Sequence, residues 1–406
     1  MHFRVLAIAS LIALAGCHLQ ADPPGDAPSG VAVAPGDGRV TVTWKQEPDL
    51  TYWIFYQTGS SVTPAAPGAT IIRDAVSARV IADLANGTQY AFVMNATKDD
   101  SAAGPASPVF PRTPRLAGAD WTSGTALGAT SLNGIAFSGS RLVAVGDLAA
   151  IFAGDYNHTS TSPPGVTAWL PPTSLPAGFT ANLSAVTYTG QFVALGIDGK
   201  ILTSSDGLTW TSATTITTGG ASMSGIVFGL GLYVAVGDGG KIFTSSDLVT
   251  WNPVTSSPTL NDLYSVSFLN GGFVATGASG TLLTSPDGVT WTARVSTPPT
   301  ANTLRGAAFS ASTGVRYVAV GDAGTIVTST DGIAWSPIAP PLAQNLSGVV
   351  FGSRFVAVGQ GGAAVFSDDG ATWTLTSAGS ANLTRVLFAP AMYVAVGAAG
   401  ANAVSK

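Results

Sequence analysis

The chain has 406 residues, of which only 10% are charged and 46% are apolar, and its formal net charge at pH 7 is −5. No lysine- or arginine-rich stretch is present to neutralise phosphates, so this composition argues against a nucleic acid partner. The 49 glycines and 25 prolines are interspersed with periodic apolar runs. That combination predicts short strands joined by tight turns, organised in two or three domains.

Residues 1–17 have the features of an export signal. A short basic start is followed by an apolar run from Val5 to Ala15. This run is shorter than the roughly 20 residues that span a bilayer. The segment Leu14-Ala15-Gly16-Cys17 then resembles a bacterial lipobox, which implies cleavage before Cys17 and acylation of that residue. The alternative is a plain secretory signal in which the cysteine is incidental.

Acylation at Cys17 would determine both the cellular location of the protein and its thiol chemistry. Each buried CH₂ of a lipid chain contributes about 0.8 kcal/mol, so two or more chains anchor a protein stably to a membrane. Because Cys17 is the only cysteine, no thiol would remain for a disulfide, a nucleophile or a metal. His18 follows the cysteine, and by resemblance to other lipoproteins this favours the bacterial outer membrane. Residues 18–26 are expected to form a tether.

Residues 27–104 contain short alternating runs typical of half-buried strands. Trp44 ends one such run, and Leu84 and Tyr90 stand six residues apart. These residues resemble a fibronectin type III domain. The resemblance implies a β-sandwich in which Trp44 packs in the core and the Tyr90 hydroxyl closes a tyrosine corner. The proline-rich segment 105–118 then predicts a stiff linker.

From residue 119 onward, one pattern recurs about every 40 residues, the period of propeller blades. An apolar run ends in Val-Ala-Val-Gly or a close variant, with another run before it and a glycine-rich turn and third run after it. Most repeats end in Ser-x-Asp-Gly-x-Thr-Trp or a variant. The seven motif glycines are Gly146, Gly196, Gly237, Gly277, Gly321, Gly359 and Gly397. Residues 119–406 are therefore expected to form a seven-bladed β-propeller with four strands per blade.

Seven tryptophans fall one to a repeat, and we expect them to pack between blades. They are Trp121, Trp169, Trp210, Trp251, Trp291, Trp335 and Trp373. Trp121 precedes the first complete repeat, whereas the seventh repeat stops at Lys406 without a tryptophan. Residues 119–122 should therefore supply the outer strand of the last blade by pairing beside residues 398–404, which removes an open sheet edge.

The repeats resemble Asp-box propellers of the sialidase type and propellers of photosystem II assembly factors. In the Asp-box family the signature is a structural turn on the face opposite the active site. Its aspartate stands five residues before the tryptophan, a place that only Asp368 fills here. In the other copies the aspartate comes one residue later, as Asp206, Asp247, Asp287 and Asp331. We interpret all of them as turn formers that accept hydrogen bonds from their own backbone.

Residues that could perform catalysis are scarce. Glycoside hydrolysis uses a pair of carboxyl groups, but the single glutamate, Glu47, lies in the first domain. The sialidase resemblance implies a tyrosine–glutamate pair and three arginines, whereas only Arg305 and Arg385 start inner strands. The small number of arginines also differs from the assembly factors, which use an arginine-rich patch. His158, the propeller's only histidine, has no evident histidine partner for a metal. We therefore expect no catalytic residue, no metal and no cofactor.

Charged residues recur in the turns after the motif glycines, on the face where propellers usually bind ligands. Asp-Gly pairs also suit hairpin turns that need a positive φ, so turn chemistry is the favoured interpretation and ligand binding is the alternative. The candidate ligand-binding residues are Asp147, Asp198, Lys200, Asp238, Lys241, Arg305, Asp322 and Arg385. An insertion within residues 152–183 is a further candidate for partner contact, because long loops on rigid scaffolds often carry binding.

These patterns favour a monomeric, non-catalytic binding or scaffolding lipoprotein of the cell envelope, with a glycan or a protein as its ligand. One alternative is a hydrolase or lyase that acts on polysaccharide and uses aspartates where glutamates usually serve. A second is an assembly factor for a membrane protein complex, which the family resemblance alone implies.

The lipobox resemblance makes a direct prediction about membrane attachment. The substitution Cys17→Ser should abolish incorporation of radiolabelled palmitate and move the protein from the membrane to the soluble fraction, because no acyl chain can be attached. Ser10→Ala, within the apolar run, should change neither readout. Retention of label or membrane attachment by Cys17→Ser would show that Cys17 is incidental.

Overall fold

A computed structural model of the chain describes residues 22–98, 102–159, 162–312 and 314–406. Within these ranges the regular structure consists of β-strands and six short 3-10 turns, which confirms the all-β class. The predicted signal and Cys17 lie outside the described residues. In the described part of the chain, no helix is long and apolar enough to span a membrane. Two compact units form, and the main boundary between them falls between Thr113 and Pro114.

The part of the chain before Pro114 contains a three-stranded sheet, β1-β2-β5, and a four-stranded sheet, β4-β3-β6-β7, although residues Pro35–Val40 and Val80–Asn86 are grouped with the second unit. Its strands are β1 (Ala32–Gly36), β2 (Arg39–Thr43), β3 (Thr51–Thr58), β4 (Thr70–Ala75), β5 (Arg79–Ile81), β6 (Tyr90–Thr97) and β7 (Phe110–Arg112). Trp44 is buried, as expected, and its ring centroid lies 5.5 Å from that of Tyr52. β7 lies in the segment assigned to the linker, where it pairs with β6. Pro111 is tolerated there because β7 is an edge strand.

The second unit contains seven four-stranded sheets within the described residues. The first four sheets consist of β9 (Leu132–Phe137), β10 (Arg141–Gly146), β11 (Ile151–Thr159) and β12 (Ser162–Val166); β13 (Leu183–Tyr188), β14 (Phe192–Gly196), β15 (Lys200–Ser204) and β16 (Thr211–Thr215); β17 (Met223–Gly229), β18 (Leu232–Gly237), β19 (Ile242–Ser245) and β20 (Asn252–Pro253); and β21 (Leu263–Leu269), β22 (Gly272–Gly277), β23 (Leu282–Ser285) and β24 (Thr292–Arg294). The last three consist of β25 (Leu304–Phe309), β26 (Tyr317–Gly321), β27 (Ile326–Ser329) and β28 (Ser336–Ile338); β29 (Leu346–Phe351), β30 (Phe355–Gly359), β31 (Ala363–Ser367) and β32 (Thr374–Ser377); and β33 (Leu383–Ala389), β34 (Met392–Gly397), β35 (Asn402–Ser405) and β8 (Thr122–Ser123).

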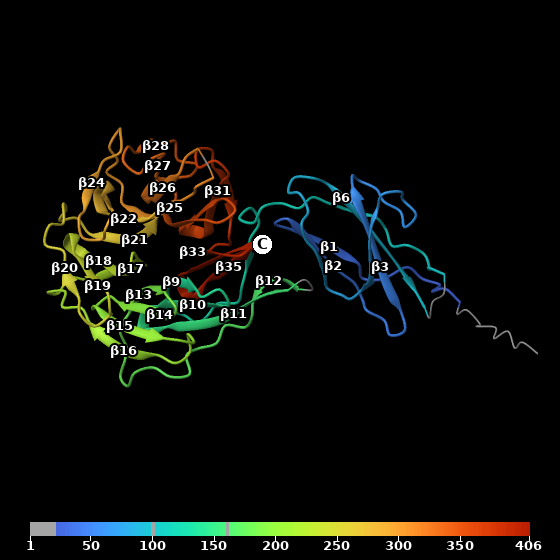
Figure 1. Cartoon of the computed structure of the whole chain (residues 1–406), viewed down its shortest axis with the longest axis horizontal. Coiled ribbons are helices and arrows are strands. Elements are labelled where there is room, and N and C mark those ends of the chain that lie inside the picture. The colour runs from blue at the N-terminus through green and yellow to red at the C-terminus, as the bar shows by residue number, and fades with distance from the viewer. Residues whose placement is uncertain (1–21, 99–101, 160–161, 313) are drawn as a thin grey trace, which may run out of the picture. The chain divides into compact units, whose positions relative to one another are not determined.

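The first strand of each repeat lies innermost, and the inner strands contact one another in a ring (Figure 1). Each inner strand touches that of the next sheet, and β33 of the last sheet touches β9 of the first. The second strands, which carry the Val-Ala-Val-Gly motif, are buried throughout, except that the first residue of β10, β18 and β22 is partly exposed. Continuous apolar runs are typical of strands covered on both faces. Each sheet therefore packs between two neighbours around a central channel.

The ring is closed by a strand from the beginning of the unit, as the tryptophan count predicted. Ser123 pairs with Ala403, and Thr122 pairs with Val404. The paired segment is thus β8, which begins directly after Trp121. Additional bonds extend the contact, since the Gly118 N–H donates to the Ser405 hydroxyl at 2.7 Å. The seventh sheet gains its outer strand in this way, and β8 covers the edge of β35 that would otherwise be open.

The insertion in the first sheet forms a hairpin of β11 and β12 rather than an irregular loop. Tyr156 pairs with Val166 across the hairpin, while Ala153 pairs with Leu170 beyond it. At its base, Arg141 holds Asp155 at 2.6 Å. The hairpin extends the first sheet, because β11 pairs with β10 on one side and with β12 on the other.

The tryptophans differ in burial more than a uniform packing role predicts. Trp210, Trp291 and Trp335 are buried between sheets, whereas the other four are partly exposed. The indole N–H of Trp210 donates to the Gly207 carbonyl at 3.0 Å, and the pattern repeats at three further copies. At Trp251 the residue in the glycine's place is Leu248, and the indole nitrogen has no partner in the described structure.

Ring closure should be measurable as stability. Deletion of residues 119–123 removes Trp121 and the strand that pairs with β35, and should lower the melting temperature by at least about 5 °C. Deletion of residues 22–26 from the predicted tether should leave the melting temperature unchanged. Equal melting temperatures for both deletions would contradict closure by β8.

Candidate functional site

The motif glycines allow a close approach of two strands at one end of each sheet. At six of the seven, Gly196 being the exception, a Cβ atom would overlap the backbone carbonyl that precedes the inner strand. The residue after the glycine donates its N–H to that same carbonyl, as Asp322 does to Thr303 at 2.9 Å. The φ angle at Gly321 is −169°, which is extended backbone that any residue adopts. Steric room, rather than backbone conformation, therefore explains the glycine.

This close approach creates a β-bulge at the second residue of every inner strand. In the second sheet, Leu183 pairs with Gly196 and Ala185 with Leu195, so that Ser184 has no partner in the ladder. The same two-against-one register occurs in all seven sheets. Bulges redirect a side chain away from the regular alternation of a strand. The bulged residues are Asn133, Ser184, Ser224, Tyr264, Arg305, Ser347 and Thr384.

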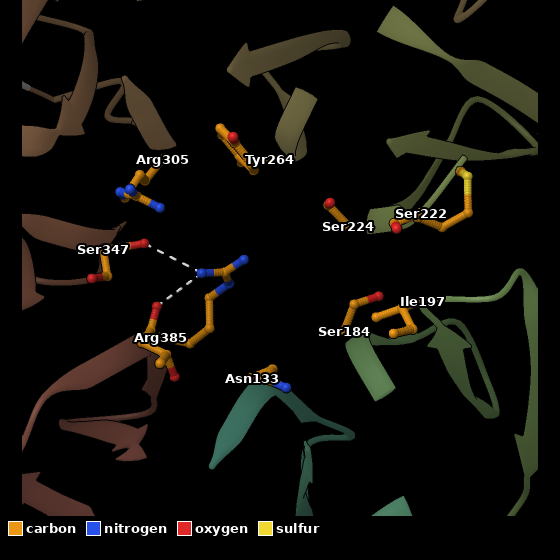
Figure 2. A pocket seen from close by; sticks show the side chains of 11 residues that line it. Asn133, Ser184, Ile197, Ser222, Ser224, Tyr264, Arg305, Ser347 and Arg385 are labelled. Atoms are coloured by element: carbon orange, nitrogen blue, oxygen red, sulfur yellow. Dashed lines mark hydrogen bonds between the residues drawn. The ribbon is translucent and has the colours of Figure 1, made fainter. Parts of the chain in front are cut away.

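All seven bulged residues line one cavity of about 270 Å³ at the channel mouth. Figure 2 shows Asn133, Ser184, Ser224, Tyr264, Arg305 and Ser347 arranged around it. The seventh, Thr384, comes from the last sheet. Most carry a hydroxyl or an amide, which can donate and accept hydrogen bonds without titrating near neutral pH. Ile197, after the second strand of the second sheet, and Met223, at the start of the third sheet, add apolar side chains to the lining. Among the described residues that line this cavity, none is Asp, Glu or His.

Arg305 is held in place by a carboxylate outside the cavity lining. Its Nε lies 2.5 Å from Asp322 Oδ1, and its Nη2 lies 3.0 Å from Asp322 Oδ2. This two-point pairing raises the pKa of Arg305, chiefly through the hydrogen bond that Arg305 donates to Asp322. The guanidinium also lies 5.5 Å from the centre of the Tyr264 ring. The Arg305 charge is thus already neutralised within the protein.

Arg385 enters the cavity from a position where the other sheets carry small residues. It follows the bulge of β33, whereas the corresponding residues are Gly134, Ala185, Gly225, Ser265, Gly306 and Gly348. Its Nη1 donates to the backbone carbonyls of Ser347 at 3.3 Å and Thr384 at 2.9 Å. Burial lowers the pKa of Arg385, and the nearby Arg305 charge lowers it further. No carboxylate among the described residues is paired with this cation.

The other charged candidates lie outside the cavity lining. Asp147 accepts a hydrogen bond from the Asn133 amide at 2.8 Å and so orients a residue that does line it. Asp198 and Lys200 pair with each other at 2.6 Å. Lys241 lines a separate groove on the third sheet, beside Trp251. Asp238 begins the 3-10 turn η2 (Asp238–Gly240) and is absent from the described lining of the cavity. Of the eight candidates, Arg305 and Arg385 come together at the mouth.

The hydroxyl and amide residues of the mouth were missed by the sequence reasoning. They occupy the second position of each inner strand, where ordinary alternation gives no reason to single out a residue. The signal that the sequence does offer is the residue directly after each bulged residue. It is glycine, alanine or serine in six repeats and arginine in one. His158, for its part, belongs to β11, and its side chain lies outside what the structure describes.

The fold resembles that of known β-propellers. YCF48 from Cyanidioschyzon merolae is 18% identical with a TM-score of 0.54, over 70% of this chain and 98% of that one. A structure titled YCF48 bound to D1 peptide is 18% identical with a TM-score of 0.56, over 70% and 96%. A catalytically inactive His-to-Ala variant of virginiamycin B lyase from Staphylococcus aureus, with quinupristin, is 12% identical with a TM-score of 0.58, over 71% and 99%. No family model matches the chain, and no curated protein sequence matches it.

These similarities show that the chain contains a β-propeller. At such low identity they concern the fold alone. They therefore confirm the propeller part of the sequence prediction, while the lipoprotein, the fibronectin type III domain and the Asp-box assignment stay predictions.

The Ser-x-Asp-Gly segments form hydrogen-bonded turns, as predicted. The Asp287 Oδ1 atom accepts from the backbone N–H groups of Val289 at 2.8 Å and Thr290 at 2.6 Å. In the last copy Asp369, rather than Asp368, occupies this place and accepts from Ala371 and Thr372. Asp368 instead pairs with Arg354 at 2.7 Å. Counting back from the tryptophan thus selected the wrong aspartate. The family pattern has one residue more between its aspartate and its tryptophan than this sequence has between Asp369 and Trp373.

These turns make stability depend on pH. Hydrogen bonds from the backbone, with Thr209 and Thr290 as the largest contributors, lower the pKa of Asp206 and of Asp287 to about 2. A carboxyl group that is more acidic when folded stabilises the protein above its ordinary pKa of 3.8, and this contribution is lost as the pH falls toward 2.

The substitution Asp287→Ala should therefore lower the melting temperature at pH 7 by about 2 °C, because two turn N–H groups lose their acceptor. The difference from the unsubstituted protein should shrink as the pH falls from about 4 to about 2 in calorimetric melts. Asp26→Ala, in the exposed tether, serves as the control and should show no difference at either pH. A difference that does not vary with pH would contradict a role for the carboxylate charge.

Proposed function

We propose that this chain is a non-catalytic binding protein of the bacterial cell envelope, whose propeller holds a glycan at the channel mouth. The observation that carries the proposal is the ring of seven bulged residues, one from each sheet, around a single cavity. Hydroxyl and amide groups that converge on a cavity match the hydroxyls of a sugar. The first domain serves as a spacer, and an acyl chain at Cys17 anchors the protein to the membrane.

The chemistry of the lining supports binding rather than turnover. General acid–base catalysis needs a titrating side chain within hydrogen-bond reach of the reacting atom. The described lining supplies two arginines, hydroxyls and an amide. The similar virginiamycin B lyase structure carries a His-to-Ala change and is described as catalytically inactive. Here no histidine belongs to the described lining, so the lyase alternative lacks a residue of that type.

A role in assembling a membrane protein complex is the second candidate. One structurally similar propeller, YCF48, has been solved with a D1 peptide bound, so this fold can present a surface to a protein segment. The two candidates differ in what the mouth binds. Co-purification of a defined membrane complex with the anchored protein, and no retention of glycans, would favour the assembly role.

The proposal is tested by glycan binding to a soluble form that begins at Asp22. We expect retention of at least one class of envelope glycan, with no release of cleaved sugar. The substitution Ser224→Leu fills the mouth and should weaken retention at least about tenfold. Ser212→Leu, on the exposed outer strand β16, should leave it unchanged. Cleavage of the glycan, or equal binding by both variants, would contradict the proposal.

A further inference from the structure

We infer that Arg385 binds a carboxylate of the ligand, so that the sugar unit held at the channel mouth is an acidic one such as a uronate. This inference rests on the proposed function and specifies the substrate class of the same site. It follows from the hydrogen-bonding state of one side chain, the charge of the cavity and the groups around it.

The free edge of the Arg385 guanidinium has the geometry of a carboxylate receptor. Among the described residues, two backbone carbonyls accept hydrogen bonds from Nη1 alone, and these bonds fix the plane of the group. The Nε and Nη2 edge faces the open middle of the cavity in Figure 2. Arg305 uses the same two atoms, Nε and Nη2, to hold both oxygens of Asp322. A carboxylate can therefore dock on Arg385 through a bidentate pair of the kind already present beside it.

The charge of the cavity calls for an anion. Asp322 neutralises Arg305, and the described lining contains no further acidic group, so Arg385 leaves one uncompensated positive charge in a confined space. Withdrawing a cation from water is unfavourable unless a partner compensates it. The six sheets with a small residue at the corresponding position show that the fold itself does not require an arginine there. The Arg385 side chain is thus available for a ligand.

The surroundings of Arg385 favour a sugar acid over other carboxylates. Ser184 and Ser224 carry hydroxyls and lie across the cavity from Arg385 in Figure 2. They can pair with the ring hydroxyls of a uronate while its carboxylate lies on the arginine. The volume of about 270 Å³ is near the lower limit of ligand pockets, about 300 Å³, and suits one ring-sized unit. A peptide carboxyl terminus would offer one backbone N–H to this ring of hydroxyls, where a uronate offers several ring hydroxyls.

The experiment is calorimetric titration of the purified chain with D-galacturonate, with its methyl ester and D-galactose as neutral analogues of matched size. We expect galacturonate to bind at least about tenfold more tightly than either analogue. Arg385→Gln should remove this preference, and Arg385→Lys should retain only part of it, because an ammonium lacks the two-point edge. Lys241→Gln removes the same charge from the separate groove and should bind as the unsubstituted chain does.

Each other outcome contradicts a defined part of the account. Equal binding of all three sugars, blocked by Ser224→Leu, would overturn the carboxylate inference and leave the proposed glycan function standing. A preference for galacturonate that survives Arg385→Gln would also overturn it. Binding of acetyl-dialanine with a free carboxyl terminus, but of no sugar, would overturn both. Because the comparison of the three sugars needs only the unsubstituted chain, misfolding of a variant would not leave the inference untested.

Discussion

The close approach of two strands at each motif glycine is the constraint from which the site follows. The glycine lets the next residue reach the carbonyl that precedes the inner strand, at 2.8 to 2.9 Å in the regular copies. Because of that hydrogen bond, two residues of the inner strand face one residue of the second strand. The second residue of the inner strand therefore has no partner in the ladder. The bulge then turns this residue toward the channel. A structural repeat thereby produces a ring of side chains that can vary without disturbing the sheets.

The same end of each sheet also joins it to its neighbour. The side chain of Asn345, at the start of the sixth sheet, accepts the N–H of Ala323 in the turn of the fifth at 2.9 Å, and Asn382 does the same for Gly361. Side chains that bond to a neighbouring turn fix the spacing of successive sheets. Closure by β8 completes the ring, so the seven bulged residues keep a common centre. The mouth is therefore a preorganised site, which limits the entropy lost on binding.

Repeats and composition predicted the architecture because periodic features persist in the sequence itself. The glycine spacing predicted the sheets, and the displaced Trp121 predicted the closing strand. The bulges could not be predicted, since they are a property of register between two strands and no single strand encodes them. The assignment of Asp368 failed for a related reason, because a turn is defined by its hydrogen bonds and not by its distance from Trp373. Arg305 and Arg385 were found because charged residues at the start of an inner strand are conspicuous in an apolar repeat.

The most direct test of this account is a crystal structure of the propeller grown with D-galacturonate. We predict that the carboxylate lies within hydrogen-bond distance of Arg385 Nε and Nη2, with sugar hydroxyls on the bulged serines. A sugar bound in the groove beside Trp251, or an empty mouth at saturating ligand, would contradict the claim that the bulges build the binding site.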